Sequence, residues 1–257
     1  MIPRIIHYCW FGGNPLPEET KKYIEGWKEK CPNYIIKEWN ESNIDLTQNQ
    51  YIKDAYKEKK WAFVTDYVRL YALVSEGGIY MDTDVELKKN LDNLLDKKAF
   101  SGFQTENSIP TGIMACEKEF PLFKELLEEY KNRSFYNTDG SINLTTNVVY
   151  ITNLCKKKGL VLDNKYQNIE GFELYPVDYF CAKSWETGIV NETENTYSIH
   201  HFAGSWESGK RKVKADRRRY FLAKYGMRMG KIIYYITTWP IHISLMIEER
   251  KETREKR

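Results

Sequence analysis

The segment from residue 61 to residue 84 constrains the fold of this chain more than any other. Residues 61–76 carry apolar side chains at helical spacing, and Gly77-Gly78 is a typical helix-terminating pair. A short apolar run, Ile79-Tyr80-Met81, follows at once and reads as a strand that stops at Asp82-Thr83-Asp84. A helix that turns directly into a buried strand is the basic unit of an α/β protein.

The rest of the chain extends this alternation of strands and helices. We expect strands at residues 2–8, 34–39, 79–81, 85–87, 99–103, 112–116, 172–177 and 197–202, and further helices at 18–30, 119–131 and 145–158. Such alternation predicts an α/β fold with a mainly parallel central sheet. Ligands of these sheets bind at the carboxyl ends of strands. The loop Trp10-Phe11-Gly12-Gly13 and the triplet at 82–84 both follow predicted strands, so we expect the site there.

Cysteine usage and the N-terminal sequence limit the class of protein. The chain has five cysteines and no C-x-x-C pair, which argues against a disulfide framework or a structural zinc site and favours a reducing compartment. The first residues, Met-Ile-Pro-Arg-Ile-Ile-His, have no basic segment followed by a long apolar run. We therefore expect no signal peptide.

The triplet Asp82-Thr83-Asp84 is a candidate metal site. Two carboxylates at i and i+2 of an extended segment lie on one side of the chain and offer the hard oxygen ligands that Mg²⁺ and Mn²⁺ prefer. A D-x-D triplet alone is also compatible with a solvated turn. Asp66 and Arg69, three positions apart on the preceding helix, would share a face. In isolation such a pair is an ordinary surface ion pair.

Taken together, these elements resemble a known family. Thr65-Asp66-x-x-Arg69, Gly77-Gly78-Ile79-Tyr80 and Asp82-Thr83-Asp84 stand in the order and spacing of the DXD sugar-transferase signature. That family includes Och-type mannosyltransferases, clostridial glucosylating toxins and bacterial capsular or lipopolysaccharide glycosyltransferases. The opening residues 3–13 and the segment 200–206 are also similar to it. The resemblance implies a GT-A-like, single Rossmann-type nucleotide-sugar-binding domain over residues 1–208 and a divalent ion, Mn²⁺ or Mg²⁺.

The resemblance also implies roles for individual residues. Asp84 would bind the metal directly and Asp82 would contact ribose or sugar hydroxyls and the metal, while Asp66 and Arg69 would hold the donor sugar. These four are the expected catalytic residues. Trp10 would stack on the nucleobase, within a loop that includes Phe11 and Gly12. The remaining expected donor-site residues are Thr65, Tyr80, Asn147, Ser205 and Trp206, with Ser205 also at the metal. The third metal ligand would be His201, with His200 as the alternative, because neighbouring residues of a strand face opposite sides.

The expected activity is that of a retaining glycosyltransferase. It would move a hexose or N-acetylhexosamine from a nucleotide sugar, with a UDP-sugar favoured over a GDP-sugar, to a glycan acceptor. A lipid-linked bacterial surface polysaccharide is the expected acceptor, as in many bacterial members. Two alternatives stay open. A metal-dependent nucleotidyltransferase or phosphodiesterase would use the same aspartates and a histidine, and a non-catalytic carbohydrate-binding protein would use the exposed aromatic rings.

Residues 209–257 differ in character from the rest of the chain. Between Lys210 and Lys231 there are ten Lys or Arg residues and one acid, Asp216. Residues 232–247 contain no charged side chain, but they are too few to span a bilayer and Pro240 interrupts them. We expect a basic, aromatic helical extension that docks on the inner face of the cytoplasmic membrane or packs on the catalytic domain. Nucleic acid is not an expected partner.

Overall fold

The computed structural model describes residues 1–109, 112–204 and 209–255, with side chains for 1–109, 112–204 and 212–239. The chain divides into two compact units. The first comprises Met1–Ala182 and Glu192–His201, and the second comprises Lys183–Asn191 and Phe202–Arg257. The second unit thus takes in Lys183–Asn191, which lies within the range 1–208 expected for the catalytic domain.

The first unit contains a seven-stranded sheet in the order β2-β1-β3-β6-β5-β8-β7. Its parallel pairs are β1 with β2, β1 with β3, and β5 with β8, whereas β6 is antiparallel to β3 and β5, and β7 to β8. Only β6 and β7 therefore run against the common direction, which confirms a mainly parallel sheet. The strands are β1 (Ile5–Cys9), β2 (Ile35–Trp39), β3 (Gly78–Met81), β5 (Ala99–Gly102), β6 (Ile113–Cys116), β7 (Gln167–Ile169) and β8 (Phe172–Tyr175).

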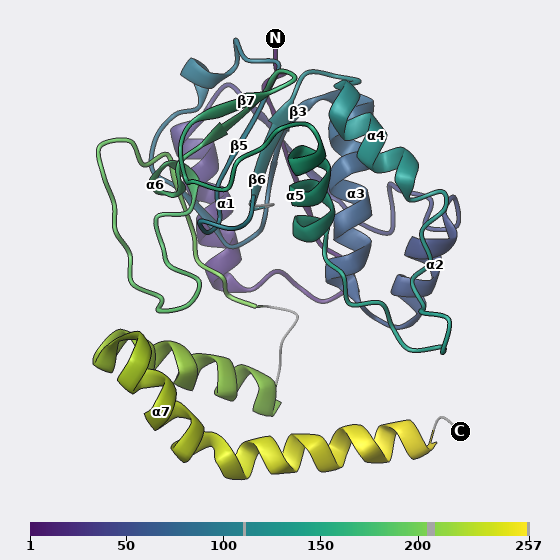
Figure 1. Cartoon of the computed structure of the whole chain (residues 1–257). Coiled ribbons are helices and arrows are strands. Elements are labelled where there is room, and N and C mark those ends of the chain that lie inside the picture. Colours follow the sequence, from purple (N-terminus) through teal and green to yellow (C-terminus); the bar gives the residue numbers. More distant parts are fainter. Residues whose placement is uncertain (110–111, 205–208, 256–257) are drawn as a thin grey trace. The chain divides into compact units, whose positions relative to one another are not determined.

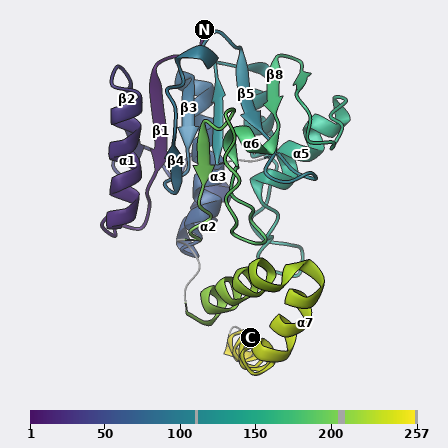
Figure 2. The same ribbon diagram turned by 90° about the vertical axis from the view of Figure 1, so that its left-hand side faces the viewer.

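Helices cover both faces of this sheet (Figures 1 and 2). The helices of the first unit are α1 (Glu18–Lys30), α2 (Gln50–Lys57), α3 (Trp61–Glu76), α4 (Pro121–Glu129), α5 (Asn147–Lys157) and α6 (Val177–Phe180), with a 3₁₀ turn at Asp92–Leu94. Alternation along β3 assigns its side chains to two cores. Tyr80 joins the core formed with α2 to α5, whereas Ile79 and Met81 join the core that contains Trp27 of α1.

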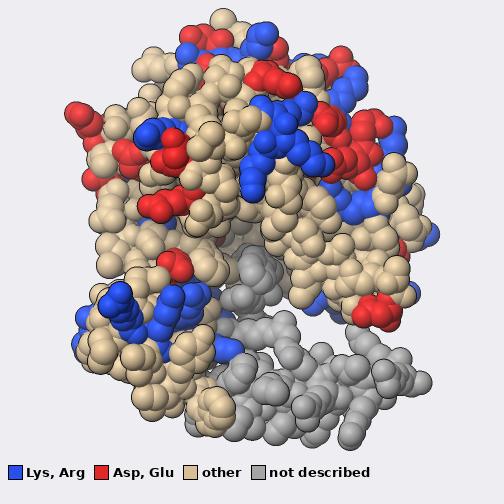
Figure 3. Space-filling model, viewed as in Figure 1, with Lys and Arg blue, Asp and Glu red and all other residues tan. Residues whose placement is uncertain are grey.

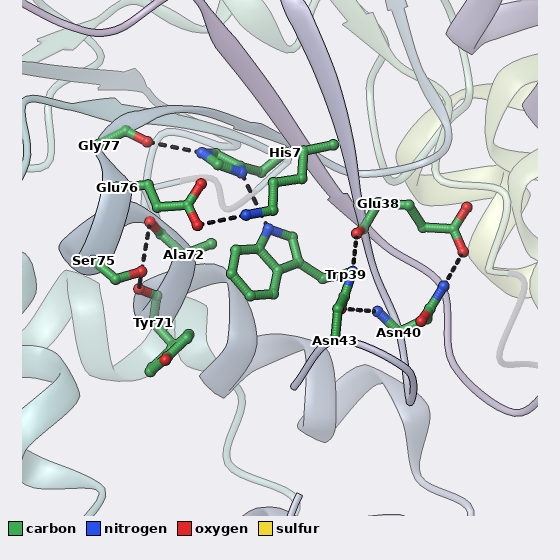
Figure 4. Close-up of polar contacts among 11 residues, drawn as sticks. His7, Glu38, Trp39, Asn40, Asn43, Tyr71, Ala72, Ser75, Glu76 and Gly77 are labelled. Atoms are coloured by element: carbon green, nitrogen blue, oxygen red, sulfur yellow. Dashed lines mark hydrogen bonds and ion pairs between the residues drawn. The ribbon is translucent and has the colours of Figure 1, made fainter. Parts of the chain in front are cut away.

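A buried polar junction fixes β1 against the turn that ends α3 (Figure 4). The Trp39 indole N–H donates to His7 Nδ1 at 3.1 Å, so His7 Nε2 carries the proton and donates to the Gly77 carbonyl at 2.8 Å. Burial lowers the pKa of His7, which keeps this ring neutral. Gly78 has φ 102°, and a Cβ there would lie 2.7 Å from the Ile5 carbonyl oxygen. The Gly-Gly pair is therefore required for close packing and sets where β3 begins.

A two-stranded antiparallel ladder stands apart from the main sheet and completes the first unit. It pairs β4 (Val85–Leu87) with β9 (Ser198–His200), with Val85 opposite His200. Because β4 directly follows the triplet at 82–84, the ladder brings the end of β9 to that triplet.

The second unit is built around α7 (Gly209–Glu255), which has a non-helical residue at Gly226 with φ 73°. Leu222, Tyr234 and Thr238 are buried. Arg218 pairs with Glu186 at 3.7 Å within this unit. Lys and Arg side chains gather on the described part of the helix (Figure 3). Among the described residues, no helix is both long and apolar enough to cross a membrane.

Candidate active site

The triplet Asp82-Thr83-Asp84 follows β3, as expected, but it forms a tight turn between β3 and β4 where an extended segment was predicted. The backbone N–H of Asp82 donates to the Gly112 carbonyl at 2.8 Å, and the N–H of Val85 donates back to the Asp82 carbonyl at 3.0 Å. The turn still presents both carboxylates on one side, toward β9.

His200 completes a cluster with these two aspartates. Its Nε2 lies 3.1 Å from Asp84 Oδ1 and 3.8 Å from Asp82 Oδ2. One potential ligand atom from each of the three residues lies within 4.8 Å of the others. Two carboxylate oxygens and one imidazole nitrogen fit a divalent ion such as Mn²⁺ or Mg²⁺. His200 is buried, which alone would lower its pKa, but the neighbouring Asp84 carboxylate raises the pKa of His200 to about 10.

The expected ligand His201 lies elsewhere, and His200 takes its place in the cluster. His201 Nε2 is 2.9 Å from Glu86 Oε2, and its ring stacks on Tyr23 with centroids 5.0 Å apart. The physical reason is the pleat of the strand: neighbouring side chains project to opposite sides. Pairing of His200 with Val85 decides which histidine faces the aspartates.

Arg69 links the helix α3 to the D-x-D turn. Its Nη2 lies 3.3 Å from Asp66 Oδ1 and 3.3 Å from Asp82 Oδ1, and all three side chains are largely buried. Arg69 also lies over the Tyr80 ring, with Cζ 4.6 Å from the centroid, and the Tyr80 hydroxyl donates to Asp82 Oδ1 at 2.8 Å. The structure therefore brings together Asp66, Arg69, Tyr80 and Asp82. The Asp66–Arg69 ion pair is therefore buried and is not a surface ion pair. Removing either partner would leave an unpaired buried charge.

Asn147 lies against Asp66 at the start of α5. Its backbone N–H donates to Asp66 Oδ2 at 3.0 Å and its side-chain N–H donates to the Asp66 carbonyl at 3.1 Å. Burial raises the pKa of Asp66 to about 6, although the charge of Arg69 acts in the opposite direction. Thr65 is half-buried beside it, and its carbonyl accepts from Arg69 Nε at 3.4 Å.

The loop after β1 holds the expected nucleotide-binding residues in different environments. Trp10 is half-buried, and its indole N–H donates to the Asn14 carbonyl at 2.6 Å. Phe11, expected at the donor, is 5% exposed and packs in the core with residues of α2 and α3, so its ring is structural. Gly12 donates its N–H to Glu41 at 2.6 Å. Ser205 and Trp206 lie outside the described residues.

Two residues beside this loop were not predicted from the sequence. Trp61, at the start of α3, lies so close to Gly12 that a Cβ there would be 2.8 Å from the indole ring. Glu41 binds both the Gly12 N–H and the Tyr56 hydroxyl. Trp61, Thr65 and Arg69 follow one another at intervals of four, so they share one face of α3. That spacing was the available clue for Trp61.

Comparison with known proteins gives matches to glycosyltransferases. The chain is 29% identical over 151 residues to an uncharacterized glycosyltransferase of Acanthamoeba polyphaga mimivirus, covering 55% of this chain and 59% of that protein. It is 25% identical over 211 residues to a mannosyl phosphorylinositol ceramide synthase of Saccharomyces cerevisiae, covering 74% of this chain and 54% of that protein. The chain thus spans little more than half the length of these two relatives.

Two solved structures are similar in part. The PaToxG glycosyltransferase matches at a TM-score of 0.49 and 19% identity, covering 62% of this chain and 70% of that chain. The galactosyltransferase LgtC matches at a TM-score of 0.43 and 12% identity, covering 83% of this chain and 93% of that chain. Both TM-scores are below 0.5.

The family described as the glycosyltransferase sugar-binding region containing a DXD motif matches residues 17–101. This range includes α3 with Asp66 and Arg69, the Gly77-Gly78 turn, and both aspartates of the D-x-D turn. The residues that the structure gathers around Arg69 are thus those of the matched region. Residues 17–101, about a third of the chain, thus match the DXD-containing glycosyltransferase family.

Proposed function

We propose that the protein is a metal-dependent, retaining glycosyltransferase with a GT-A-type catalytic unit. It transfers a hexose or N-acetylhexosamine from a nucleotide sugar to a glycan acceptor. The observation that carries this proposal is the continuous network in which Arg69 joins Asp66 to Asp82, next to the cluster of Asp82, Asp84 and His200. The network and the cluster together provide a site for a cation and buried polar groups suited to sugar hydroxyls.

Each part of this network has a place in sugar transfer. Asp82, Asp84 and His200 would hold Mn²⁺ or Mg²⁺, and the ion would neutralise charge on the departing diphosphate. Asp66 would accept hydrogen bonds from hydroxyls of the donor sugar. The fixed positive charge of Arg69 would keep the carboxylates oriented and add electrostatic stabilisation near the leaving group.

The proposed donor is a UDP-sugar. The support is the Trp10-Phe11-Gly12-Gly13 loop, which resembles the uracil-binding loop of the toxin branch of the family. A GDP-sugar is the competing donor, because the name of the yeast relative specifies mannosyl transfer and the family includes mannosyltransferases.

The proposed acceptor is lipid-linked, at the inner face of the cytoplasmic membrane, and α7 provides the membrane contact. The named product of the yeast relative is a ceramide lipid, which supports an acceptor of this kind. The described part of α7 combines many Lys and Arg residues with exposed apolar side chains, a composition typical of interfacial helices. These side chains are Val213, Tyr220, Tyr225, Met227, Met229, Ile232, Tyr235, Ile236 and Trp239.

The test is a hydrolysis screen over UDP- and GDP-sugars with Mn²⁺, with Mg²⁺ and with a chelator, for wild type and Asp84→Ala. We expect one nucleotide sugar to release free sugar of retained anomeric configuration in the presence of metal, and Asp84→Ala to be inactive. Equal turnover by Asp84→Ala would refute the proposal. Release of a sugar phosphate in place of free sugar would identify a phosphodiesterase.

A further inference from the structure

Arg133, four positions after the end of α4, is buried between two aromatic rings. Its Cζ lies 4.0 Å from the centroid of the Tyr130 ring and 3.4 Å from that of Tyr150, and its side chain is 7% exposed. Nη2 pairs with Glu129 Oε2 at 3.0 Å. Nη1 is buried and has no hydrogen-bond partner among the described residues. A buried guanidinium N–H without an acceptor is costly unless a ligand supplies one.

Within the described part of the chain, Asn147 has a buried hydrogen-bond acceptor that lacks a donor, whereas Arg133 has a buried donor that lacks an acceptor. Its amide nitrogen donates to the Asp66 carbonyl, and turning the amide over would place oxygen against oxygen, so the orientation is fixed. Oδ1 is buried and has no donor among the described residues. This orphan acceptor belongs to a side chain that contacts Asp66, a proposed sugar-binding residue.

The two orphan atoms belong to one neighbourhood. Asn147 and Tyr150 are three positions apart on α5 and therefore lie on the same face of that helix. Arg133 lies on Tyr150, and its charge is among those that act on Asp66. One atom can donate a hydrogen bond and the other can accept one. A hydroxyl group both accepts and donates, so hydroxyls of a sugar match the pair.

We infer that Arg133 is a specificity-determining residue of the donor site, where Arg133 Nη1 and Asn147 Oδ1 bind hydroxyls of the donor hexose beside Asp66. The inference rests on the proposed function, which did not include Arg133. Neither atom is exposed to solvent, so binding of the sugar requires the side chains around them to move.

The experiment uses the full-length protein with Mn²⁺ and the nucleotide sugar that wild type hydrolyses fastest. Arg133→Met keeps an unbranched side chain and removes its donors, and Arg133→Lys keeps the charge. Lys131→Met, which removes an exposed cation two positions away, is the matched control. For each protein, kcat/KM for donor hydrolysis and Kd for UDP are measured. A set of monodeoxy donors is then tested on wild type and Arg133→Met.

We expect Arg133→Met to lower kcat/KM by about tenfold to a hundredfold, as for a lost hydrogen bond to a charged group, with the UDP Kd within twofold of wild type. Lys131→Met should match wild type. One monodeoxy donor should be poor for wild type and no poorer for Arg133→Met. If Arg133→Met does not fold, the same comparison is made with Arg133→Lys, whose single ammonium group can pair with Glu129 but lacks the second guanidinium nitrogen, and the same loss is expected.

Three results would overturn this inference while leaving the proposed function in place. They are unchanged kcat/KM in Arg133→Met, a parallel loss of UDP binding, and a loss that is equal for every deoxy donor. The last two would identify Arg133 as structural. If wild type hydrolyses no nucleotide sugar at all, the proposed function fails and the inference fails with it.

Discussion

Gly112 and His200 are packed so closely that a Cβ on Gly112 would lie 2.6 Å from the Nδ1 atom of the His200 ring. Gly112 also binds the Asp82 N–H through its carbonyl. The absence of a side chain at this one position therefore allows the histidine to reach the aspartates.

Gly112→Ala is expected to weaken Mn²⁺ binding by roughly 10–100-fold, the usual cost of disturbing groups that orient metal ligands. Calorimetric titration of Mn²⁺ in the presence of UDP measures it. Gly26→Ala is the control, since a Cβ on Gly26 meets nothing within 4 Å and removing a glycine from α1 should be neutral or stabilising. Unchanged Mn²⁺ affinity in Gly112→Ala would show that His200 is not a ligand.

The two adjacent histidines should respond differently to substitution. His200→Ala removes one of three clustered ligand atoms and is expected to lower Mn²⁺ affinity at least about tenfold. His201→Ala removes a contact with Glu86 and Tyr23 and should leave Mn²⁺ affinity within about threefold of wild type. Manganese titration followed by electron paramagnetic resonance distinguishes the two, and the opposite ranking would restore His201 as the ligand.

Asp66→Asn should change the pH dependence of stability. Asp66 has a pKa near 3.8 when exposed and about 6 in the fold, so folding favours its neutral form. In wild type, the contribution of Asp66 to the free energy of unfolding is therefore fully present below pH 4 and is lost as the pH rises through 6. Asparagine does not titrate. The free energy of unfolding of the variant should therefore rise relative to that of wild type between pH 4 and 6, by up to about 2–3 kcal/mol at 1.4 kcal/mol per pKa unit.

Chemical denaturation in the presence of a chelator, at pH 4, 5, 6 and 7, measures this difference. The same variant should lose sugar transfer at least about tenfold while UDP binding is kept, because a carboxylate that binds hydroxyls is replaced. A stability difference that is constant with pH would mean that Asp66 is ionised throughout this range.

Trp10→Ala should weaken UDP binding by about 1–3 kcal/mol, the usual contribution of stacking between a base and an aromatic ring. Calorimetry with UDP and GDP, both with Mn²⁺, measures the loss and the nucleotide preference together. Trp185→Ala, which changes a partly exposed tryptophan of the second unit, is the control. Tighter binding of GDP than of UDP would favour the mannosyltransferase branch.

Replacing Ile236 and Trp239 of α7 with serine should weaken binding to anionic vesicles by about tenfold or more at low salt, since both side chains are highly exposed. Donor hydrolysis in solution should not change. Ile35→Ser is the matched control, because Ile35 is a similarly exposed apolar residue on β2. Wild-type protein that ignores such vesicles would exclude the membrane proposal.

The helix–turn–strand unit was predictable because its determinants are local. Apolar spacing, a terminating Gly-Gly pair and the triplet that follows all lie within residues 61–84, and α3 has the predicted bounds. The resemblance to known transferases also identified Asp66, Arg69 and Asp82, which the structure brings together. The mainly parallel character of the sheet was predictable, but the antiparallel direction of β6 was not, since nothing in its residues marks it.

The remaining parts of the site depend on contacts between distant segments. Both histidines follow a strand-like run, and only the pairing of β9 with β4 determines that His200 faces the aspartates. Arg133 stands in a segment without a motif, and its importance comes from Tyr130 and Tyr150, which fold over it. Phe11 belongs to a loop that resembles a nucleotide-binding loop, yet alternation along the chain turns its ring into the core.

The β4–β9 ladder also determines when the metal site can form. Its partners are far apart in sequence, since Val85 pairs with His200, 115 positions later. Pairing across such a separation carries a large loop-closure cost and usually forms late in folding. A growing chain that already carries the whole DXD region still lacks His200. Full metal affinity should therefore be acquired only after nearly all of the first unit has been synthesised.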